Sequence, residues 1–586
     1  MAELGDFEAA RRELTEVLAT DRRNAALRFN LAMVVEALGE IEAAAVHYSV
    51  ALRLQPKFAE AARRLTRLLA RFKIEDPATL DPAGLEAALA VHGIAHQPIA
   101  ETIVAVAFFH DDTLAGLMRE FATGGDAGEI ARRLVVSRTH EGLKPSGLHA
   151  ALMRGVVRST AVERLLTAVR RALLLDTPRA RFEDRNLYAF ALALMQAAAN
   201  GDYAWAETAE ETAALAAIAI DTGQLGAGDL EMSHRLLLAA MYRPVGAVLG
   251  RGADAVRDRI RPKPLREVLA PRLAAESEER SIAAALPRLR PIADAISQRV
   301  ATQYERSTYP RWTSAQIASP GGLKPTLRKF FSEGSLAQLD RPYEVLIAGA
   351  GTGQQVIQSA WALGPHARVL AIDLSAASLA YAKRMAAAYG ITNVEFMVAD
   401  ILDLGRLGRL FQVIECVGVL HHMADVWAGW RALLDRLAPG GLAYIALYSA
   451  ISRANLRRLR AEPGYPGPGC SDNAARAYRA ELMARPAGAP GTELLHSRNF
   501  FSLHEFRDLA LHASEQHVSL GDIAGFLSEH RLRFAGFTLE PQIIERFHAF
   551  AGTPERPGSL ADWQRFEEAN PHTFDAMYAF WTERLQ

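Results

Sequence analysis

Hydrophobic residues follow two different patterns, and the change between them divides the chain near residue 300. In the first part, apolar residues recur at intervals of three and four between Gly, Pro and Asp breaks, as in AVERLLTAVRRALLL and RNLYAFALALMQAAAN. This spacing predicts one helix after another, with no notable strand alternation. We therefore expect an all-helical middle domain over residues 73–300, a scaffold in which we find no nucleophile–base pair, metal cluster or phosphate loop.

Residues 1–72 contain an internal repeat. LGDFEAARRELTEVL begins at Leu4 and LGEIEAAAVHYSVAL begins at Leu38, an offset of about 34 residues that is the period of a tetratricopeptide (TPR) repeat. Small residues such as Ala44 let two helices approach, Tyr48 fills the gap between them, and Pro56 ends the second helix. This predicts a short TPR-like arm that leans on the next domain. It either offers a groove to a protein or peptide partner, or serves packing or dimerisation.

From residue 345 the pattern changes to strands that alternate with helices. EVLIAGAGTGQQVIQSAWAL reads as an apolar strand, a glycine turn and a helix, and RVLAIDLS, NVEFMVADILDL, FQVIECVGVLHHM and LAPGGLAYIALYS add four strands. This order predicts an α/β Rossmann-like domain with a doubly wound, mostly parallel sheet over residues 301–586. LRFAGFTLE at 532–540 reads as a sixth strand. Residues 450–530 then form a helical insertion over the ligand-binding edge, and residues 541–586 form a helical C-terminal segment.

Ligand-type residues stand at the carboxyl ends of these predicted strands, where doubly wound sheets bind ligands. The first strand runs into a glycine turn, the second ends in Asp373 and the third ends in Asp400. The glycine turn alone is weak evidence, because dinucleotide-binding enzymes carry a similar turn. An acidic residue at the end of the second strand can accept hydrogen bonds from ribose hydroxyls.

The series GAGTG, AID, VAD, LHHM and LAPGG, over about residues 340–450, resembles the class I S-adenosylmethionine-dependent methyltransferase family. An NAD-binding domain rarely shows the second aspartate, LHH and PGG in this register. The resemblance implies S-adenosylmethionine as cofactor, with Asp373 at the ribose, Leu374 beside the adenine, Asp400 at the adenine amino group and Ile401 stacked on the ring. Alternatives are a helix cap for Asp373, and Asp403 in the place of Asp400. The full set of implied cofactor residues on the strands and turns is Gly349, Ala350, Gly351, Gly353, Asp373, Leu374, Asp400, Ile401, Glu415, Cys416 and Val417.

The flanking segments extend the resemblance to bacterial TPR-fused methyltransferases. QYERSTYPRW at 303–312 resembles the lead-in of that group, and segments after residue 500 resemble its C-terminal part. In this resemblance the residues that close over the cofactor are Tyr304, Tyr309, Arg311 and Trp312, with Arg311 paired to its carboxylate. Alternatively, Tyr309 and Trp312 only anchor the lead-in against the sheet.

A base is needed only if the methyl acceptor arrives protonated, and histidine titrates near neutral pH. The candidates are His421, His422, His512 and His517. Asp508, His512 and Glu515 share one face of a predicted helix, which either lines an acceptor pocket or is solvated. No metal is expected, because an adjacent His-His pair cannot easily chelate one ion and no carboxylate joins it at ligand spacing.

Composition narrows the function further. A net charge of −1 argues against a dedicated nucleic-acid binder. Two cysteines allow no disulfide framework, and no signal peptide or membrane span is evident, so we expect a soluble cytoplasmic protein. Three functions remain open. They are a methyltransferase for a protein or peptide side chain presented by the arm, a small-molecule methyltransferase whose arm mediates assembly, and a scaffold that binds S-adenosylmethionine without turnover. A homodimer is an option for the arm.

Overall fold

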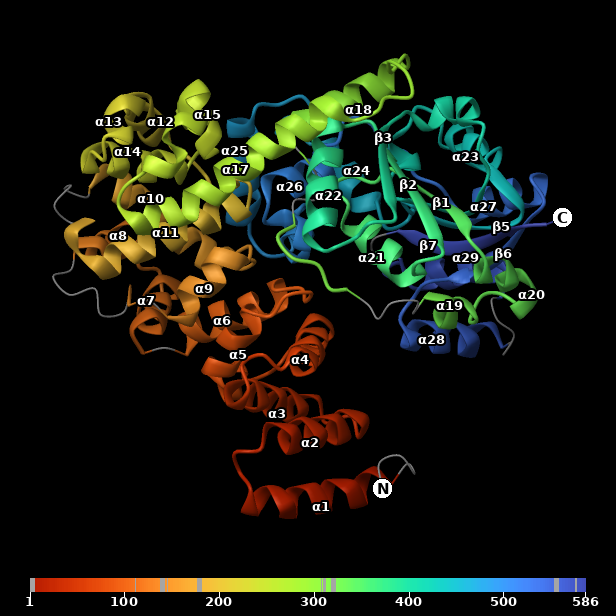
Figure 1. Ribbon diagram of the computed structural model, residues 1–586, viewed down its shortest axis with the longest axis horizontal. Coiled ribbons are helices and arrows are strands. Elements are labelled where there is room, and N and C mark those ends of the chain that lie inside the picture. Colours follow the sequence, from red (N-terminus) through yellow and green to blue (C-terminus); the bar gives the residue numbers. More distant parts are fainter. Residues whose placement is uncertain are drawn as a thin grey trace.

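The computed structural model describes residues 6–110, 112–136, 143–144, 146–176, 182–306, 308, 312–317, 323–552, 558–574 and 577–585. The chain forms a helical half and a half built on a β-sheet, which lie side by side, and an N-terminal arm projects from them (Figure 1). Among the described residues, no helix combines the length and the apolar character that a membrane crossing requires.

The arm is a stack of short helices. They are α1 (Phe7–Thr20), α2 (Ala25–Ala37), α3 (Ile41–Leu54) and α4 (Ala59–Arg71). Asp6 and Asn24 cap α1 and α2 with their side chains. Tyr48 is fully buried, and its hydroxyl donates to Glu36 at 2.6 Å. Glu36 of α2 also pairs with Arg64 of α4, so α2 and α4 lie next to each other.

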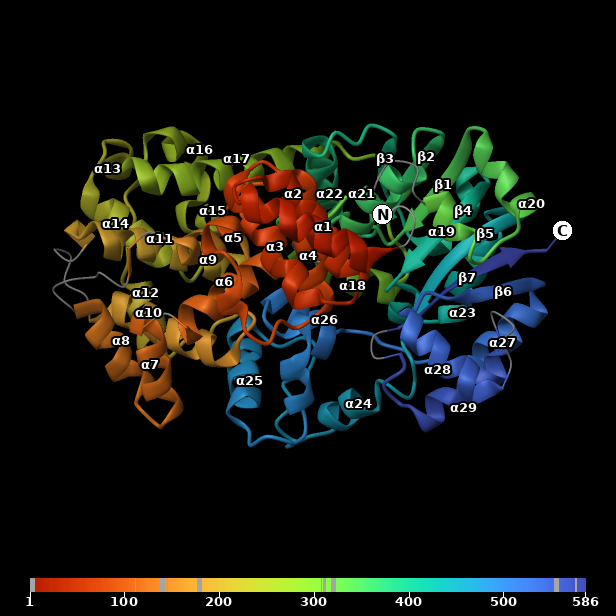
Figure 2. The same ribbon diagram turned by 90° about the horizontal axis from the view of Figure 1, so that it is seen from below.

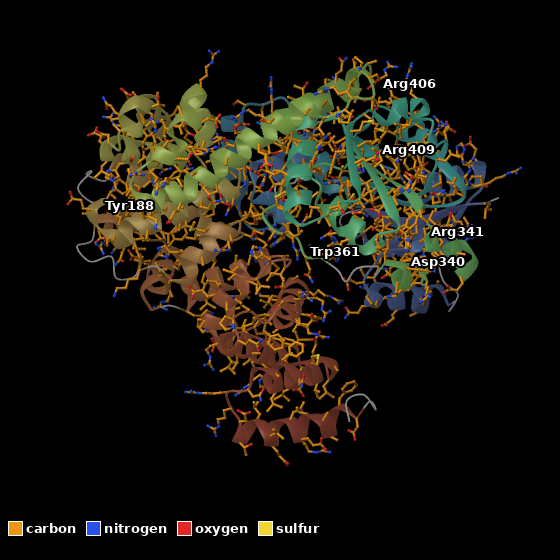
Figure 3. All side chains as sticks on the ribbon, in the orientation of Figure 1. Tyr188, Asp340, Arg341, Trp361, Arg406 and Arg409 are labelled. Carbon is orange, nitrogen blue, oxygen red and sulfur yellow. The ribbon has the colours of Figure 1, made fainter. Side chains whose placement is uncertain are left out.

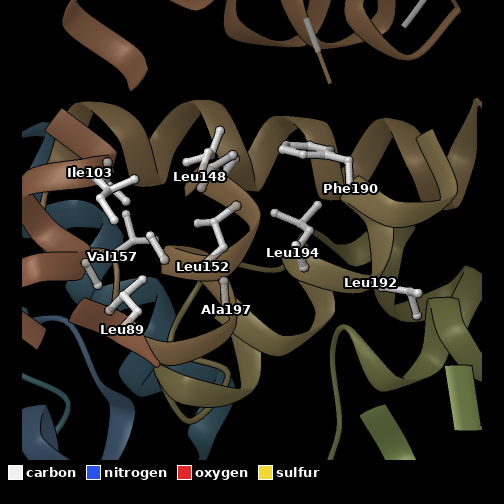
Figure 4. Packing of buried hydrophobic residues seen from close by; sticks show 14 of the residues in the cluster. Leu89, Ile103, Leu148, Leu152, Val157, Phe190, Leu192, Leu194 and Ala197 are labelled. Carbon is white, nitrogen blue, oxygen red and sulfur yellow. The ribbon is translucent and has the colours of Figure 1, made fainter. Parts of the chain in front are cut away.

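The middle region is helical throughout its described residues from 82 to 285. Its helices are α5 (Pro82–Leu89), α6 (Gln97–Phe109), α7 (Asp112–Ala122), α8 (Ala127–Val136), α9 (Gly147–Arg154), α10 (Thr160–Leu175), α11 (Arg185–Asn200), α12 (Ala209–Ala216), α13 (Thr222–Gly226), α14 (Leu230–Ala240), α15 (Val245–Leu249), α16 (Ala253–Val256) and α17 (Lys263–Ala285). Leu148 and Leu152 of α9 pack between Ile103 of α6 and Phe190 of α11 (Figure 4). One continuous core runs from Leu18 in the arm into this region. The arm and the middle region therefore share their hydrophobic interior.

The sheet has seven strands in the order β3-β2-β1-β4-β5-β7-β6. They are β1 (Tyr343–Ala348), β2 (Ala367–Asp373), β3 (Val394–Val398), β4 (Phe411–Val417), β5 (Leu437–Leu447), β6 (Leu532–Phe537) and β7 (Tyr578–Arg584). The first five strands are parallel, whereas β7 runs antiparallel to both β5 and β6. The predicted doubly wound, mostly parallel sheet is confirmed.

The C-terminal segment departs from the sequence-based expectation. Residues 541–586 were expected to be helical, but β7 lies within them and inserts between β5 and β6. The sequence YAFWTER alternates side chains across the sheet, and Phe580 and Trp581 fill the cores on its two faces. The strand follows two helices, and because apolar residues stand on both of its faces, it lacks the alternation of apolar and polar residues that identifies a strand in the sequence.

Helices cover both faces of the sheet. They are α18 (Ala295–Arg306), α19 (Leu323–Leu327), α20 (Glu333–Leu336), α21 (Gln354–Leu363), α22 (Ala376–Ala388), α23 (Val426–Leu434), α27 (Leu520–Glu529), α28 (Pro541–Ala551) and α29 (Leu560–Ala569). The sheet half begins before residue 301, because Leu289 donates its N–H to the Val398 carbonyl at the edge strand β3. At the amino ends of the strands, Arg409, which is labelled in Figure 3, pairs with Glu344 and Glu395.

The segment between β5 and β6 contains α24 (Ala454–Arg460), α25 (Asp472–Ala484) and α26 (Leu503–Ala510) before α27. These helices lie between the middle region and the sheet half (Figures 1 and 2). Arg479 of α25 forms a bidentate ion pair with Glu163 of α10 at 2.5 and 2.6 Å, and both side chains are buried. Ser502 donates to Asp202 at 2.6 Å. The middle region therefore holds this insertion in place beside the strand ends.

Candidate active site

A pocket of about 270 Å³ opens at the carboxyl ends of β1 to β4. The strand ends, α18 and α26 all contribute to its wall. The sequence-predicted residues that line it are Gly349, Ala350, Gly351, Asp373, Leu374, Asp400, Ile401, Val417 and His422. Residues predicted separately from the sequence therefore converge on one cavity.

The turn after β1 is tightly packed. Gly349 has a φ of +77°, and a Cβ at this position would lie 2.1 Å from Val419 Cγ2. Only glycine therefore fits between β1 and the end of β4. Gly353 serves a different purpose from the predicted one. It does not line the pocket, and a Cβ there would meet the Ala382 Cβ at 2.5 Å, so it lets α21 approach α22.

Asp373 ties the end of β2 to the glycine turn. Its Oδ2 accepts the N–H of Gly351 and its Oδ1 accepts the N–H of Ser375, both at 2.8 Å. Burial raises the pKa of Asp373, although these two backbone donors act in the opposite direction. The N-cap of α22 is Ser375 and not Asp373. The carboxylate therefore remains directed at the pocket that it lines.

Asp400 and Asp403 have different surroundings. Asp400 is buried, lines the pocket and accepts the Leu402 N–H at 3.0 Å. Asp403 does not line the pocket and pairs with Arg290 at 3.2 Å. Of the two carboxylates, Asp400 is the one in position to meet a ligand.

The three predicted residues of β4 are separated by the alternation of side chains along the strand. Val417 lines the pocket. Cys416 is fully buried in the core on one face of the sheet, and burial raises its pKa. Glu415 borders a neighbouring cavity, where its Oε2 accepts hydrogen bonds from Gln355 and Ser359. Cys416 and Glu415 were expected at the cofactor, but neither lines its pocket.

The lead-in is anchored through Trp312. Its indole N–H donates to the Thr352 carbonyl at 3.2 Å, and the Tyr381 hydroxyl donates to the Trp312 carbonyl. Tyr304 of α18 lines the pocket. Tyr309 and Arg311 lie outside the described residues.

The helix predicted through Glu515 is shorter than expected, because α26 ends at Ala510. His512 bonds the Ser514 backbone two residues further on, and this local contact competes with helical hydrogen bonding. Asp508 and His512 nevertheless come together, since the chain folds back over the pocket. The predicted shared helical face was wrong for His512 and Glu515.

His422 and His512 both contact the backbone of Ser514. The Nδ1 of His422 lies 2.8 Å from the Ser514 carbonyl oxygen, and the Nδ1 of His512 lies 2.6 Å from the same oxygen and 3.1 Å from the Ser514 nitrogen. Because a carbonyl oxygen only accepts, the Nδ1 of His422 carries a proton, which leaves a lone pair on its Nε2. His422 lines the pocket, and among the described residues no group hydrogen-bonds to its Nε2. Burial lowers the pKa of His422 well below its ordinary value, so the ring is neutral near pH 7.

Tyr304 and Asp508 complete this polar wall. The Tyr304 hydroxyl donates to Asp508 Oδ1 at 2.6 Å and lies 3.2 Å from His512 Nε2. Burial raises the pKa of Asp508, while His512 and the Tyr304 hydroxyl lower it. The sequence grouped Asp508 and His512, but only the tertiary structure adds Tyr304 from α18.

The other two candidate bases do not line the pocket. His421 is fully buried, its ring stacks on Tyr448 with centroids 3.6 Å apart, and its Nδ1 accepts the Tyr448 N–H at 3.3 Å. His517 pairs with Glu515 at 2.8 Å. Burial raises the pKa of Glu515, but the hydrogen bond from His517 and the charges of Arg453 and Arg460 outweigh it and lower that pKa to about 2. Both histidines therefore contact neighbouring segments of the protein, His421 at Tyr448 and His517 at Glu515, and not the pocket.

The expectation that no carboxylate lies near the His-His pair was wrong, because the structure brings Asp508, together with His512, to His422. Ligand atoms of His422, Asp508 and His512 lie within 4.8 Å of one another. However, the two rings stack with centroids 3.5 Å apart at 24°, so their lone pairs run side by side and do not converge. The Tyr304 hydroxyl already binds Asp508. This geometry fits a hydrogen-bond network better than a chelate.

Several pocket residues escaped the sequence analysis. Tyr448 and Met423 lie at the ends of quoted motifs, LAPGGLAYIALYS and FQVIECVGVLHHM, so their position after a strand was a usable signal. Ser297 and Val300 lie on α18, whose docking over the sheet follows from tertiary packing alone. Met577 precedes β7, which the sequence did not predict.

Comparison with known proteins agrees with this geometry. The sequence profile described as "Methyltransferase domain" matches residues 345–441, which run from β1 into β5. Residues 345–441 are a methyltransferase domain. Together with the sheet, this match makes the domain a class I methyltransferase and its cofactor S-adenosylmethionine. The pocket residues fit that cofactor, because an acidic side chain stands at the end of both β2 and β3 beside the glycine turn.

Part of the chain is similar to parts of two curated proteins. An uncharacterized protein of Synechococcus sp. is 35% identical over 173 residues, which are 28% of this chain and 40% of that protein. The release factor glutamine methyltransferase of Xylella fastidiosa is 37% identical over 105 residues, which are 18% of this chain and 38% of that protein. The chain thus spans about two fifths of the length of these relatives.

Solved structures are also similar in part. PKMT2 from Rickettsia typhi in complex with AdoHcy aligns over 47% of this chain and 53% of that chain, at 16% identity and a TM-score of 0.30. The magnesium protoporphyrin IX methyltransferase of Synechocystis aligns over 53% and 94%, at 13% identity and a TM-score of 0.24.

Proposed function

We propose that the whole chain transfers a methyl group from S-adenosylmethionine to a protein or peptide side chain. When bound, the cofactor supplies a methyl group on a sulfonium centre. The observation that carries the proposal is that the cofactor pocket reaches His422, whose Nε2 lone pair has no protein partner among the described residues.

In this proposal the chain contributes positioning and proton transfer. Asp373 and Asp400 hold the nucleoside part, and the glycine turn lets backbone groups approach the rest of the cofactor. Holding donor and acceptor in line can supply roughly 7–11 kcal/mol of the barrier in well-aligned cases. His422 Nε2 accepts the acceptor's proton, while its Nδ1–H remains bonded to the Ser514 carbonyl and stabilises the charged ring.

The arm supports a protein or peptide acceptor. It projects from the body of the molecule (Figure 1), and its helices α2 and α4 lie next to each other and so offer one surface. The similar release factor glutamine methyltransferase is, by its name, an enzyme that modifies a protein side chain. A TPR-like arm of this kind would recruit the acceptor protein. The pocket alone would also suit a small molecule.

Incubation of the full chain and labelled S-adenosylmethionine with a cell lysate tests the proposal. We expect label in protein, and loss of that label with Asp373→Ala. Label confined to small metabolites would reject the protein acceptor while keeping the methyl transfer. Asn30→Arg on α2 and Arg63→Glu on α4 alter exposed positions of the arm, and Glu13→Arg on α1 is the control. Reduced protein labelling by the first two variants alone supports recruitment through α2 and α4.

A further inference from the structure

A second cavity adjoins the cofactor pocket. It has a volume of about 530 Å³, and Gln355 and Val417 line both cavities. Its base is the face of the sheet where β4, β5 and β7 lie side by side. Leu323 of α19 and Ile544 of α28 contribute to its walls. The methyl transfer proposed above makes no use of this space.

Three residues of neighbouring strands form a row across the base of the cavity. Glu415 of β4 is in register with Tyr444 of β5, and Tyr444 is in register with Trp581 of β7. The rings of Tyr444 and Trp581 stack with centroids 4.9 Å apart at 30°. The row therefore places a carboxylate at one end of an aromatic surface.

The carboxylate of Glu415 is only partly satisfied. The residue is 3% exposed. Its Oε2 accepts hydrogen bonds from Gln355 Nε2 and Ser359 Oγ, both at 2.7 Å, but no group among the described residues donates to Oε1. No Lys, Arg or His of the described part of the chain forms an ion pair with Glu415. A buried carboxylate is costly without a cation or further donors.

The rest of the cavity wall leaves room for a ligand. Strand β6 has an irregularity between Phe534 and Gly536, opposite Trp581. Gly536 lines the cavity at a φ of +135°, a conformation that favours glycine, and it presents no side chain to fill the space. Apart from Glu415 and the phenol of Tyr444, the ionisable side chains on the wall are Lys329, which is exposed, and His548. The cavity is thus largely apolar, with the buried carboxyl group of Glu415 at its base. Burial raises the pKa of Glu415, although the hydrogen bonds from Ser359 and Gln355 lower it, and a bound cation would favour the charged form.

We propose that this cavity binds a cationic amine, whose ammonium group donates to Glu415 while its apolar part lies against Tyr444 and Trp581. Aromatic faces attract cations, and a carboxylate repels anions, so the wall selects for positive charge. A primary ammonium group carries three N–H donors, and one of them is enough for a hydrogen bond to Glu415 Oε1. This binding site is separate from the site of methyl transfer and does not require turnover.

Tryptophan fluorescence of the full chain tests the proposal, because Trp581 and Trp563 both line the cavity. The probe is 2-phenylethylammonium, and its neutral counterpart is 2-phenylethanol. We expect saturable binding of the ammonium compound at least about 10-fold tighter than that of the alcohol. Glu415→Gln retains the shape and should reduce the ammonium affinity to that of the alcohol. Glu395→Gln, on the exposed edge strand β3, is the matched control and should change nothing.

Equal binding of ammonium and alcohol, or an unchanged preference in Glu415→Gln, would overturn the proposal. If Glu415→Gln fails to melt cooperatively, Tyr444→Leu takes its place and should weaken the ammonium compound more than the alcohol. Trp581→Phe should remove most of the fluorescence response without abolishing binding by calorimetry. All these measurements are made without S-adenosylmethionine, so a failure of the proposed methyl transfer would leave their outcome unaffected.

Discussion

The imidazole rings of His422 and His512 stack with centroids 3.5 Å apart, and the Nδ1 atoms of both rings lie 2.8 and 2.6 Å from the Ser514 carbonyl oxygen. This contact fixes the tautomer of His422, because a carbonyl oxygen only accepts and Nδ1 must carry the proton. His422 thereby presents a lone pair to the pocket, while the Nε2 of His512 lies 3.2 Å from the Tyr304 hydroxyl. A single backbone carbonyl thus sets the position of the proton on His422.

Replacement of His422 tests its role as proton acceptor. His422→Phe keeps a ring in the stack but removes Nε2, so kcat should fall by roughly 10²–10⁴-fold. The apparent affinity for S-adenosylmethionine should change little. Because burial lowers the pKa of His422, the wild-type kcat should decrease on the acid side only below the ordinary histidine pKa of about 6.5. The variant should lose this acid-side decrease of kcat.

The control is His421→Phe, which preserves the stacking on Tyr448 and changes a residue that does not itself line the pocket. Steady-state kinetics over a pH series compares the two variants. A His422→Phe enzyme with wild-type kcat and pH profile would rule out proton transfer through this ring. A His421→Phe enzyme as impaired as His422→Phe would point to a structural effect instead.

Replacement of Asp373 tests the cofactor site. Asp373→Ala removes the acceptor of the Gly351 and Ser375 N–H groups and leaves both unpaired next to the pocket. Binding of S-adenosylmethionine, measured by calorimetry, should weaken by at least about 10-fold, since one such loss costs about 1–3 kcal/mol. Asp403→Ala makes the same change of charge outside the pocket and should bind normally. Equal loss in both variants would contradict the assignment.

Buried histidines should make the protein sensitive to mild acid. Burial lowers the pKa of His149 to about 4 and also lowers the pKa values of His421 and His422. Below about pH 6.5 the unfolded chain binds protons that the folded chain does not, so the free energy of unfolding falls as pH falls. Each such histidine adds a slope of at most about 1.4 kcal/mol per pH unit, until its folded pKa is reached. Denaturant unfolding between pH 7 and pH 4.5 measures the combined slope.

His149→Leu isolates one of these groups. Both ring nitrogens of His149 are buried without a hydrogen-bond partner among the described residues. An apolar side chain of similar size should therefore keep or raise the stability at pH 7 and make the slope shallower by about one proton. An unchanged slope would show that His149 does not contribute to the acid sensitivity.

The buried ion pair between Arg479 and Glu163 should hold the insertion to the middle region. Arg479→Met leaves Glu163 buried and unpaired, which should cost about 3–5 kcal/mol in the free energy of unfolding. The double variant Glu163→Leu with Arg479→Met should lose much less, because neither charge is then left alone. Arg63→Met, at the exposed pair with Glu60, should cost under about 1 kcal/mol. Additive losses in the double variant would disprove the direct coupling.

The sequence by itself determined the sheet and the cofactor end of the pocket. Five apolar runs, three of them followed by Gly349, Asp373 and Asp400, predicted five parallel strands. Each strand and each turn has its own local sequence pattern, and these patterns follow one another along the chain in the order of the elements. The carboxyl ends of parallel strands meet at one edge, so residues far apart in sequence could be grouped correctly. Periodicity alone did not reveal β7, since Phe580 and Trp581 make both of its faces apolar, and its insertion between β5 and β6 is decided by tertiary structure.

Tertiary structure decided the chemistry of the rest. Tyr304 meets Asp508 because α18 crosses the sheet, and His512 stacks on His422 because the chain leaves the helix after Ala510. Sequence spacing could not separate Glu415, Cys416 and Val417, which the pleat of β4 directs to different surroundings. Local patterns fix which residues stand at strand ends. Only the packing of distant helices fixes which side chains face one another, and their burial sets which of them carry a proton.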